Sequence, residues 1–583
     1  MTAYVFDIET NSIEDVTEIF CIVALDIETG VIHAFNPDNL EEAYDLLKKA
    51  DILIGHNIVN YDIPWIKKIA GVDLSDKKVI DTLVVSRLTN PVREKGHGLK
   101  VWGETLNFPK SDFEEFDRFS EEMLMYCRND VLLNKKVYDT LKREASGFSR
   151  QSLDIETKVA RLVRKQEEAG FLLDEKEASL LLAELQEKMD KVTEEVKKTF
   201  KPKRLVTTLY SRKNKDGGIS KMAETLEGKR VRLTDEDYEE IIKSGTIDRE
   251  KIKEFKLGSR KQIGEYLQEF GWKPKKFTKT GQPIIDERVL ANVKNIPEAQ
   301  MISQYLMLQK RIAQLTSWFK ALREDGRVHG FINHNGTITG RMTHRNPNMS
   351  QVPSCAAPYG KECRACWVVP PKHKLVGIDA SGLELRMLAH YMNDEEFINE
   401  ILNGDIHKAN QKLAGIESRD KAKTFIYALI YGAGNNKLGS VVGGNIEEGK
   451  RLRDTFMHNL PAFKNLIRRV ERASTKGYLK GLDGRRIIIR SRHSALNALL
   501  QSGGSIAMKQ ALILFDNMTR DFGARIVGNI HDEWQVEVPD RYGLPAIVGE
   551  AGVAAIRKAS EILKLNCPLD GEFKIGNNWS ETH

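Results

Sequence analysis

The first part of the chain alternates short apolar runs with turn residues, a pattern typical of β-strands. Four such runs are present: 4–6, 20–25, 31–35 and 52–54. Residues 28–30 read Glu-Thr-Gly, which indicates a tight turn between the second and third runs. Residues 40–49 have the period of a helix instead. The pattern predicts a small mixed α/β domain that begins with an antiparallel meander.

Beyond this domain the period of the apolar positions changes. Between 155 and 200 they recur as in amphipathic helices with dense charge. Segment 201–258 interrupts that pattern with Lys-Pro-Lys-Arg and Asp-Gly-Gly, and helical periodicity resumes at 259–270. We therefore interpret 201–258 as an inserted loop segment. The remainder, 320–583, alternates strands with helices, and helices dominate between 394 and 480.

Length and composition predict a multidomain α/β protein of the cytoplasm. The chain has 583 residues, 41% of them hydrophobic, and a net charge of +6. It has no apolar run long enough to cross a bilayer and does not begin with a secretory pattern, so we expect no membrane contact. Of six cysteines only Cys363 and Cys366 are close in sequence, and no second pair completes a zinc site. Reduced, unpaired thiols are the favoured interpretation.

Four acids and a tyrosine in the first 130 residues suggest a metal-dependent site. Asp7 and Glu9 stand two apart on an expected strand and so point to one face. Asp62 follows a later strand, and Tyr126 and Asp130 share a helix face. Clustered carboxylates need a cation, and oxygen ligands favour Mg²⁺ or Mn²⁺, as in two-metal phosphodiesterases. The alternative, for each acid separately, is a solvated surface residue.

Two further acids lie at strand ends in the second half of the chain. Asp379 ends the apolar run 375–378, and Asp532 lies at the expected tip of a hairpin between 526–530 and 534–536. Each of these acids alone is compatible with an ordinary turn residue.

Between these acids, four residues recur every fourth position along an expected helix: Arg419, Lys423, Tyr427 and Tyr431. One helix face therefore changes from cationic to aromatic. Cations near a helix N-terminus suit a triphosphate, and tyrosines beyond them suit a base and a sugar. Solvated charges and core tyrosines would explain the residue types but not their register.

The N-terminal motifs resemble the DEDDy family of 3′–5′ exonucleases. They occur in the family's order: Asp-Ile-Glu-Thr, then Asn-x3-Tyr-Asp, then Tyr-x3-Asp. The first motif is repeated at 26–29, but the expected turn there argues against that copy. Three further segments resemble the three motifs of family A DNA polymerases. They are Asp379 with Ser-Gly-Leu-Glu-Leu-Arg, the four-residue stripe, and His-Asp-Glu at 531–533. Further motifs extend the resemblance to the replicative enzymes of T-seven-type phages along nearly the whole chain.

The resemblance implies a fold and a domain order. It predicts a ribonuclease H-like exonuclease domain followed by a right-hand polymerase with palm, thumb and fingers. The implied boundaries are 1–147 for the exonuclease, 148–321 for a helical thumb with 201–258 inserted, 322–391 and 497–583 for the palm, and 392–496 for the fingers. The implied activity is template-directed DNA synthesis with proofreading, in phage genome replication within the host cytosol.

The resemblance also implies roles for individual residues. Asp7, Glu9, Asp62 and Asp130 would hold one magnesium pair while Tyr126 orients water, and Asp379, Asp532 and the Ala380 carbonyl would hold the other pair. His407, Arg419 and Lys423 would bind the nucleotide's phosphates, and Lys423 would also protonate pyrophosphate. Glu384 and Tyr427 would lie beside the sugar and exclude ribonucleotides. Tyr431 would lie near the template base. Arg341, Gln501 and His531 would touch the primer-template duplex.

The implied partners are primer-template DNA, deoxynucleoside triphosphates, host thioredoxin through 201–258, and a helicase-primase near the tail 577–579. Two alternatives stay open for 201–258. Its first part, 201–232, holds ten Lys/Arg against three Asp/Glu and could contact DNA phosphates directly, or the segment could have no partner.

Three rival functions remain open at this level. A nuclease whose C-terminal part only binds nucleic acid would make Asp379 and Asp532 incidental. A polymerase with a vestigial exonuclease is the second rival, although all four N-terminal acids are present. A DNA clamp or scaffold without magnesium-dependent chemistry is the third.

Overall fold

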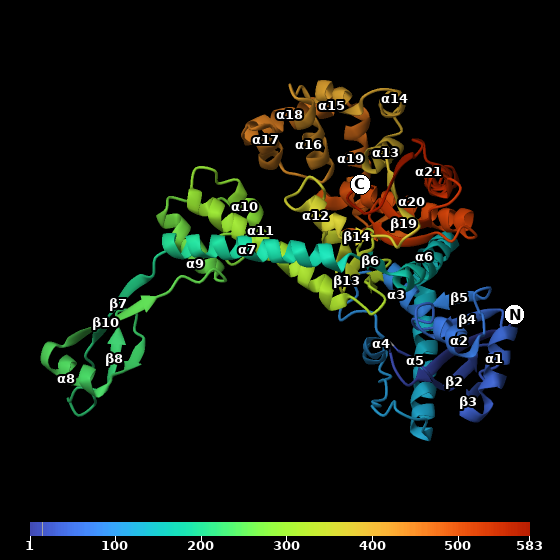
Figure 1. The fold of residues 1–583 in the computed structure, drawn as a ribbon, viewed down its shortest axis with the longest axis horizontal. Coiled ribbons are helices and arrows are strands. Elements are labelled where there is room, and N and C mark those ends of the chain that lie inside the picture. The colour runs from blue at the N-terminus through green and yellow to red at the C-terminus, as the bar shows by residue number, and fades with distance from the viewer. Residues whose placement is uncertain (14) are drawn as a thin grey trace. The chain divides into compact units, whose positions relative to one another are not determined.

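The computed structural model describes residues 1–13 and 15–583, which form two compact units. The larger unit contains 1–175 and 318–583, and the smaller contains 176–317. Figure 1 labels the elements of both. Within the described ranges no helix is both long and apolar enough to span a membrane. All six cysteines are free, as expected.

The N-terminal part of the larger unit is a five-stranded sheet of order β3-β2-β1-β4-β5. Its strands are β1 (Ala3–Thr10), β2 (Ile19–Asp26), β3 (Ile32–Phe35), β4 (Ile52–Gly55) and β5 (Lys78–Asp81). The predicted antiparallel meander β1-β2-β3 is confirmed, and β4 and β5 continue the sheet in parallel with β1. The turn predicted at 28–30 is also confirmed, because Asp26 accepts hydrogen bonds from the Glu28 and Thr29 amides at 2.8 and 3.2 Å.

Helices cover both faces of this sheet, because alternate β1 side chains point to opposite sides. Phe6 joins the core with α1 (Leu40–Lys49) and α2 (Asp62–Ala70), whereas Val5 packs with Met123 of α5 (Glu121–Glu144). Helix α1 has the bounds that its periodicity predicted. Ser120 caps α5 by accepting a hydrogen bond from the Met123 amide, which fixes where this long helix begins.

The C-terminal part of the same unit is built on a four-stranded sheet of order β18-β19-β15-β20. The strands are β15 (His373–Ala380), β18 (Arg525–Ile530), β19 (Glu533–Pro539) and β20 (Gly571–Gly576). Val376, Ile378 and Trp534 of this sheet share one core with α20 (Ala495–Thr519) and α21 (Leu544–Ile562). The two helices pack against each other, and α21 also covers β15 (Figure 1).

Helices dominate the segment between β15 and β18, as the sequence pattern predicted. They are α13 (Leu383–Met392), α14 (Glu395–Asn403), α15 (Ile406–Ala414), α16 (Arg419–Ile430), α17 (Asn435–Val442), α18 (Ile446–Asn459) and α19 (Pro461–Ser474). A short hairpin follows, formed by β16 (Tyr478–Lys480) and β17 (Arg486–Ile488).

Helix α6 (Arg150–Ala169) lies in the stretch 148–321 that the sequence analysis expects to form the thumb. The helix belongs to the larger unit, because Ile155, Val159 and Val163 lie in the same core as the C-terminal sheet. Its fully buried Glu156 binds Arg485 and Lys509, each at 2.6 Å. Separating this buried carboxylate from its two cationic partners would leave uncompensated buried charges, which is energetically costly. The ion cluster therefore specifies where α6 packs.

The smaller unit is helical, with one folded insertion. Its helices are α7 (Glu175–Thr199), α9 (Arg260–Glu269), α10 (Glu287–Ala291) and α11 (Pro297–Ala321), the first and last continuing into the larger unit. The interpretation of 201–258 as a loop is wrong. This segment forms a sheet of order β10-β7-β8-β9 from Lys203–Tyr210, Met222–Thr225, Arg230–Arg232 and Thr246–Lys253, with α8 at Asp235–Ser244.

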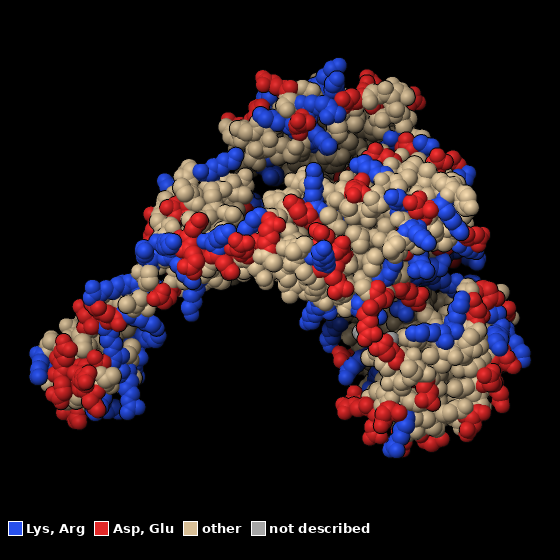
Figure 2. Space-filling view, viewed as in Figure 1, with Lys and Arg blue, Asp and Glu red and all other residues tan. Residues whose placement is uncertain are grey.

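The insertion misled the sequence pattern because only one face of its sheet is covered. Leu209, Ala223 and Ile247 form a small core with Ile241 of α8. The other positions are mostly charged or polar, and the strands β8 and β9 are too short to give clear alternation. Figure 2 shows acidic side chains gathered over α8 beside basic ones.

Candidate active sites

The strand β1 and two helices bring the N-terminal acids together. The ligand atoms of Asp7, Glu9 and Cys127 lie within 4.8 Å of one another. Asp62, the first residue of α2, accepts a hydrogen bond from the Ile8 amide at 3.2 Å. Asp130 reaches the group from α5, which packs on β1 and β2. We call Asp7, Glu9, Asp62 and Asp130 the N-terminal acid cluster.

Burial raises the pKa of every carboxyl in this cluster, and repulsion within the cluster adds to the effect at Asp7 and Glu9. The pKa of Asp7 lies well above its usual range, first because of burial and then because of Asp62, Glu9 and Asp130. Burial, followed by repulsion from Asp130, raises the pKa of Glu9 to about 8. The Asp130 Oδ1 atom is buried without a hydrogen-bond partner in the described part of the chain. Such an arrangement of oxygens fits a divalent cation, whose charge would remove the repulsion.

Two residues near this cluster were missed by the sequence analysis. Lys110 donates a hydrogen bond to Asp130, and its Nζ atom lies 4.7 Å from the centre of the Tyr126 ring. It comes from an irregular segment, so no periodicity could have indicated its position. Cys127 donates to the Asp7 carbonyl at 3.5 Å. Its position three residues before Asp130 on one helix was an available signal.

Tyr126 lies beside the acid cluster in an aromatic group. The centre of its ring is 5.5 Å from that of Phe113 and 6.1 Å from that of Phe116. Burial is the main cause of the raised pKa of its hydroxyl. The phenol is therefore neutral at physiological pH and able to donate or accept a hydrogen bond.

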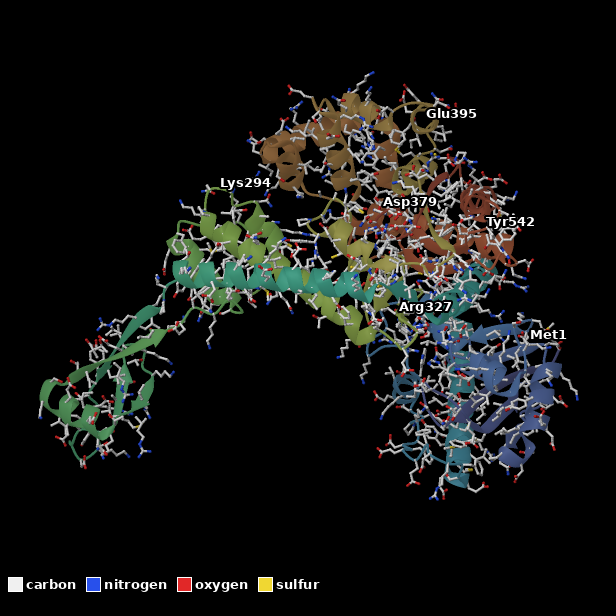
Figure 3. The ribbon with its side chains drawn as sticks, in the orientation of Figure 1. Met1, Lys294, Arg327, Asp379, Glu395 and Tyr542 are labelled. Atoms are coloured by element: carbon white, nitrogen blue, oxygen red, sulfur yellow. The ribbon has the colours of Figure 1, made fainter. Side chains whose placement is uncertain are left out.

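The second acidic site lies where β15 meets the hairpin β18-β19. Asp379 on β15 faces Glu533 of β19 in the strand register, and the Ala380 amide donates to the Asp532 carbonyl at 3.1 Å. Figure 3 labels Asp379 in this region. His531, at the hairpin tip, takes a positive φ of 60°, which is uncommon for a residue other than glycine. Burial, then repulsion from Asp532 and Glu533, raises the pKa of Asp379 to about 7.

Glu533 is occupied by the C-terminal tail. Its Oε1 atom accepts hydrogen bonds from Gln535 and from the Trp579 indole at 2.6 Å, and its Oε2 atom pairs with His583 at 2.7 Å. Burial alone would raise the pKa of Glu533, but these partners lower it overall. Trp579 is fully buried, and the Arg364 guanidinium stacks on its ring. The indole thus holds Glu533, the first residue of β19 and the neighbour of Asp532.

Helix α16 carries most of the stripe of cations and tyrosines. Ser418 caps the helix, and Arg419 in its first turn pairs with Asp405 at 3.0 Å. The Tyr427 ring lies 6.5 Å from that of His407 on α15. Lys423 is close enough to His407 to lower the pKa of the imidazole, after the larger effect of burial. Tyr431 lies one residue beyond the helix, at its C-cap.

Two expected residues from distant segments converge on the carboxylate of a third. Glu384, on the first turn of α13, accepts hydrogen bonds from the Arg341 guanidinium at 3.1 Å and from the Tyr431 hydroxyl. The expected neighbour Tyr427 lies near enough for Glu384 to raise the pKa of its hydroxyl, again after burial. Gln501, on α20, makes no side-chain hydrogen bond within the described residues.

A family model described as DNA polymerase family A matches residues 231–581. The chain belongs to the family A DNA polymerases. It is 33% identical over 705 aligned residues to the DNA-directed DNA polymerases of Enterobacteria phage T3 and Escherichia phage T7, covering 99% of this chain and 100% of each relative. DNA polymerase I of Pseudomonas aeruginosa is 29% identical over 57% of this chain and 39% of that protein.

A solved structure shares the fold of this family A polymerase. The POL domain of Pol1 from M. smegmatis, in complex with DNA primer-template and dNTP, superposes with a TM-score of 0.76 at 19% identity. The match covers 100% of this chain and 96% of that chain. The predicted family, multidomain α/β fold and polymerase activity are therefore confirmed, and enzymes of this family use divalent metal ions.

Proposed function

We propose that this family A polymerase extends a primer 3′ end by two-metal phosphoryl transfer at Asp379 and Asp532. The observation that carries the proposal is the approach of Asp379, on β15, to Asp532, in the turn between β18 and β19: burial and then repulsion from Asp532 raise the pKa of Asp379. These two side chains and the Ala380 carbonyl would hold two Mg²⁺ ions, for which Mn²⁺ can substitute. When bound, the ions activate the primer hydroxyl and stabilise the leaving pyrophosphate. Magnesium-dependent primer extension tests the proposal.

The residues of α15 and α16 would bind the incoming nucleotide. Arg419 and Lys423 lie on the first two turns of α16, where their charges and the helix dipole favour phosphate. The Asp405 carboxylate holds the Arg419 guanidinium in place, and His407 has a buried Nδ1 without a described partner. Lys423, for which no ion pair is found in the described chain, is suited to donate a proton to pyrophosphate.

The carboxylate of Glu384 would exclude ribonucleotides. Arg341 and Tyr431 hold it in one position, and Tyr427 lies nearby. Tyr431 itself is 43% exposed, as expected of a ring available to stack near the templating base. Arg341, His531 and Gln501 would contact the duplex beyond it.

We expect Glu384→Ala to raise the ratio of ribonucleotide to deoxyribonucleotide incorporation by about tenfold to a hundredfold, because it removes bulk beside the 2′ position. Single-nucleotide extension with each substrate measures the ratio. Glu395→Ala is the matched control, since Glu395 is exposed at the start of α14 (Figure 3). An unchanged ratio in Glu384→Ala would remove this residue from sugar selection.

We also propose that the N-terminal acid cluster is a 3′–5′ exonuclease that proofreads the primer. Support comes from four carboxylates around one point, with raised pKa values and an unpartnered Asp130 oxygen. Two Mg²⁺ ions would bind here, and Tyr126 would orient the attacking water. The domain limits proposed are 1–147 for the exonuclease, 148–321 for the thumb with 201–258 inserted, 322–391 and 497–583 for the palm, and 392–496 for the fingers. The phage relatives support a role in phage genome replication in the host cytosol.

The insertion 201–258 would bind host thioredoxin as a processivity factor. Its support is a pair of exposed apolar side chains on the face of β7 and β10 opposite the small core. Val206 is 53% exposed and Ile252 is 68% exposed, on neighbouring strands of the sheet. Exposed apolar groups on paired strands are typical of a protein-binding surface.

On a long primed template, thioredoxin is expected to lengthen the products of the wild type by about tenfold or more. The reason is that a polymerase tethered to its template adds many nucleotides in one binding event instead of in repeated encounters. Val206→Asp/Ile252→Asp should abolish that increase without slowing extension of a short template. Leu226→Asp is the control, because Leu226 is 85% exposed in a turn away from this pair. If thioredoxin leaves the wild-type product length unchanged, the thioredoxin assignment is wrong.

A further inference from the structure

The ammonium group of Lys110 lies among the side chains of the N-terminal acid cluster. It donates a hydrogen bond to the Asp130 Oδ2 atom, and its Nζ atom lies 4.7 Å from the centre of the Tyr126 ring. The Lys110 side chain is 23% exposed and that of Asp130 is 3% exposed, so water screens this ion pair only weakly. The Lys110 charge also partly offsets the rise in the pKa of Asp7 and Glu9 that burial and the neighbouring carboxylates cause. Lys110 therefore acts on an expected metal ligand and on the tyrosine expected to orient water.

Backbone contacts fix the irregular segment that carries Lys110. The Phe108 amide donates to the Gly103 carbonyl at 2.9 Å, near the end of α4 (Leu99–Thr105). A Cβ atom on Gly103 would lie only 2.8 Å from the Phe108 carbonyl oxygen, so the absence of a side chain permits this close approach. The side chain of Asn129 on α5 donates to the carbonyl of the residue before Lys110 at 3.4 Å. The backbone of Lys110 is thus placed by α4 and α5.

The two carboxylate oxygens of Asp130 have different surroundings. The Oδ2 atom accepts the hydrogen bond from Lys110, whereas the Oδ1 atom is buried and has no hydrogen-bond partner among the described residues. A buried oxygen without a partner is costly, and a divalent cation is a ligand that would satisfy it. Because the carboxylate group is planar, holding Oδ2 also sets the direction of Oδ1. Lys110 and a metal ion can therefore bind Asp130 at the same time, on different oxygens.

We propose that Lys110 is a positioning residue of the exonuclease, an inference that rests on the function proposed for the N-terminal acid cluster. Its ammonium holds Asp130 by Oδ2, so that Oδ1 is directed to a metal ion, and it holds the Tyr126 ring beside the cluster. A lysine that only neutralised the acids would compete with the metal ions, and its removal would favour both metal binding and turnover. A lysine needed only for the fold would be required for both. A positioning lysine separates the two: without it, metal ions should bind more tightly while turnover slows.

The test compares Lys110→Met, an unbranched side chain without charge, with Lys110→Arg, which keeps the charge. For 3′-end degradation of single-stranded DNA, Lys110→Met should lower kcat by about tenfold to a hundredfold and change KM by less than about twofold, because the loss arises within the loaded site. Its Mn²⁺ binding should tighten by about threefold or more, since a cation beside the site is removed. Electron paramagnetic resonance on the full-length protein measures this binding, with Asp532→Ala added to silence the polymerase site. Lys110→Arg should restore kcat to within about threefold of the wild type.

Lys67→Met is the matched control, because Lys67 on α2 also pairs with an aspartate, Asp73 at 2.7 Å, but is 59% exposed. It should match the wild type in both measurements, and primer extension by each variant with an intact polymerase site shows that it is folded. The role of Lys110 is overturned if Lys110→Met degrades DNA as fast as the wild type, if its Mn²⁺ binding weakens together with turnover, or if Lys110→Arg is as slow as Lys110→Met. Degradation that is lost in Asp7→Ala but kept in Lys110→Met would overturn this role alone. A wild type that degrades no DNA would overturn the exonuclease proposal, and the role of Lys110 with it.

Discussion

Asp532→Ala is expected to lower nucleotide incorporation by about a thousandfold or more, because a catalytic metal supplies several kcal/mol of transition-state stabilisation. Asp532 and Asp379 are the two carboxylates at the junction of β15 with the hairpin, and burial raises the pKa of both. With one of them removed, the remaining carboxylate cannot hold two ions. Single-turnover extension of a labelled primer measures the loss.

The control for this variant lies on the same hairpin. Asp540 follows β19, is exposed, and its side chain has no partner among the described residues, so Asp540→Ala should extend primers at the wild-type rate. Degradation of a 3′ end by Asp532→Ala should continue, which separates loss of chemistry from loss of fold. Incorporation by Asp532→Ala near the wild-type rate would instead favour a nuclease whose C-terminal part only binds nucleic acid.

For Asp7→Ala, degradation of a primer 3′ end should fall by about a thousandfold while primer extension continues. The variant should remain folded, because the pKa of Asp7 is raised by burial and by repulsion from three neighbouring carboxylates, so its removal relieves an unfavourable interaction. Release of nucleotides from labelled single-stranded DNA in magnesium measures the rate. Addition of a chelator should stop the wild type as well.

The repeated motif at 26–29 offers a matched control for the first acid pair. Glu28 is exposed in the turn after β2, so Glu28→Ala should degrade DNA like the wild type. If neither the wild type nor Glu28→Ala releases nucleotides, the exonuclease is vestigial and the acid cluster has only a structural role. Equal loss in Asp7→Ala and Glu28→Ala would mean that the two motifs had been assigned wrongly.

Local pattern in the sequence was sufficient to predict the elements that carry both sites. Strand alternation put Asp7 and Glu9 on one face, and two apolar runs around residues 531–533 predicted the hairpin with Asp532 at its tip. The four-residue period predicted the helix that begins at Arg419. These features depend on neighbours within a few residues, and such patterns follow from backbone geometry alone.

Contacts between distant segments were decided only by the tertiary structure. The convergence of Arg341 and Tyr431 on Glu384, and the approach of Lys110 to Asp130, join positions that share no period along the chain. Helix α6 packs with the larger unit because Glu156 finds its cationic partners more than three hundred residues away. The period of the sequence determines on which face of its helix or strand a side chain lies. Packing and ion pairing determine which other segment that face contacts.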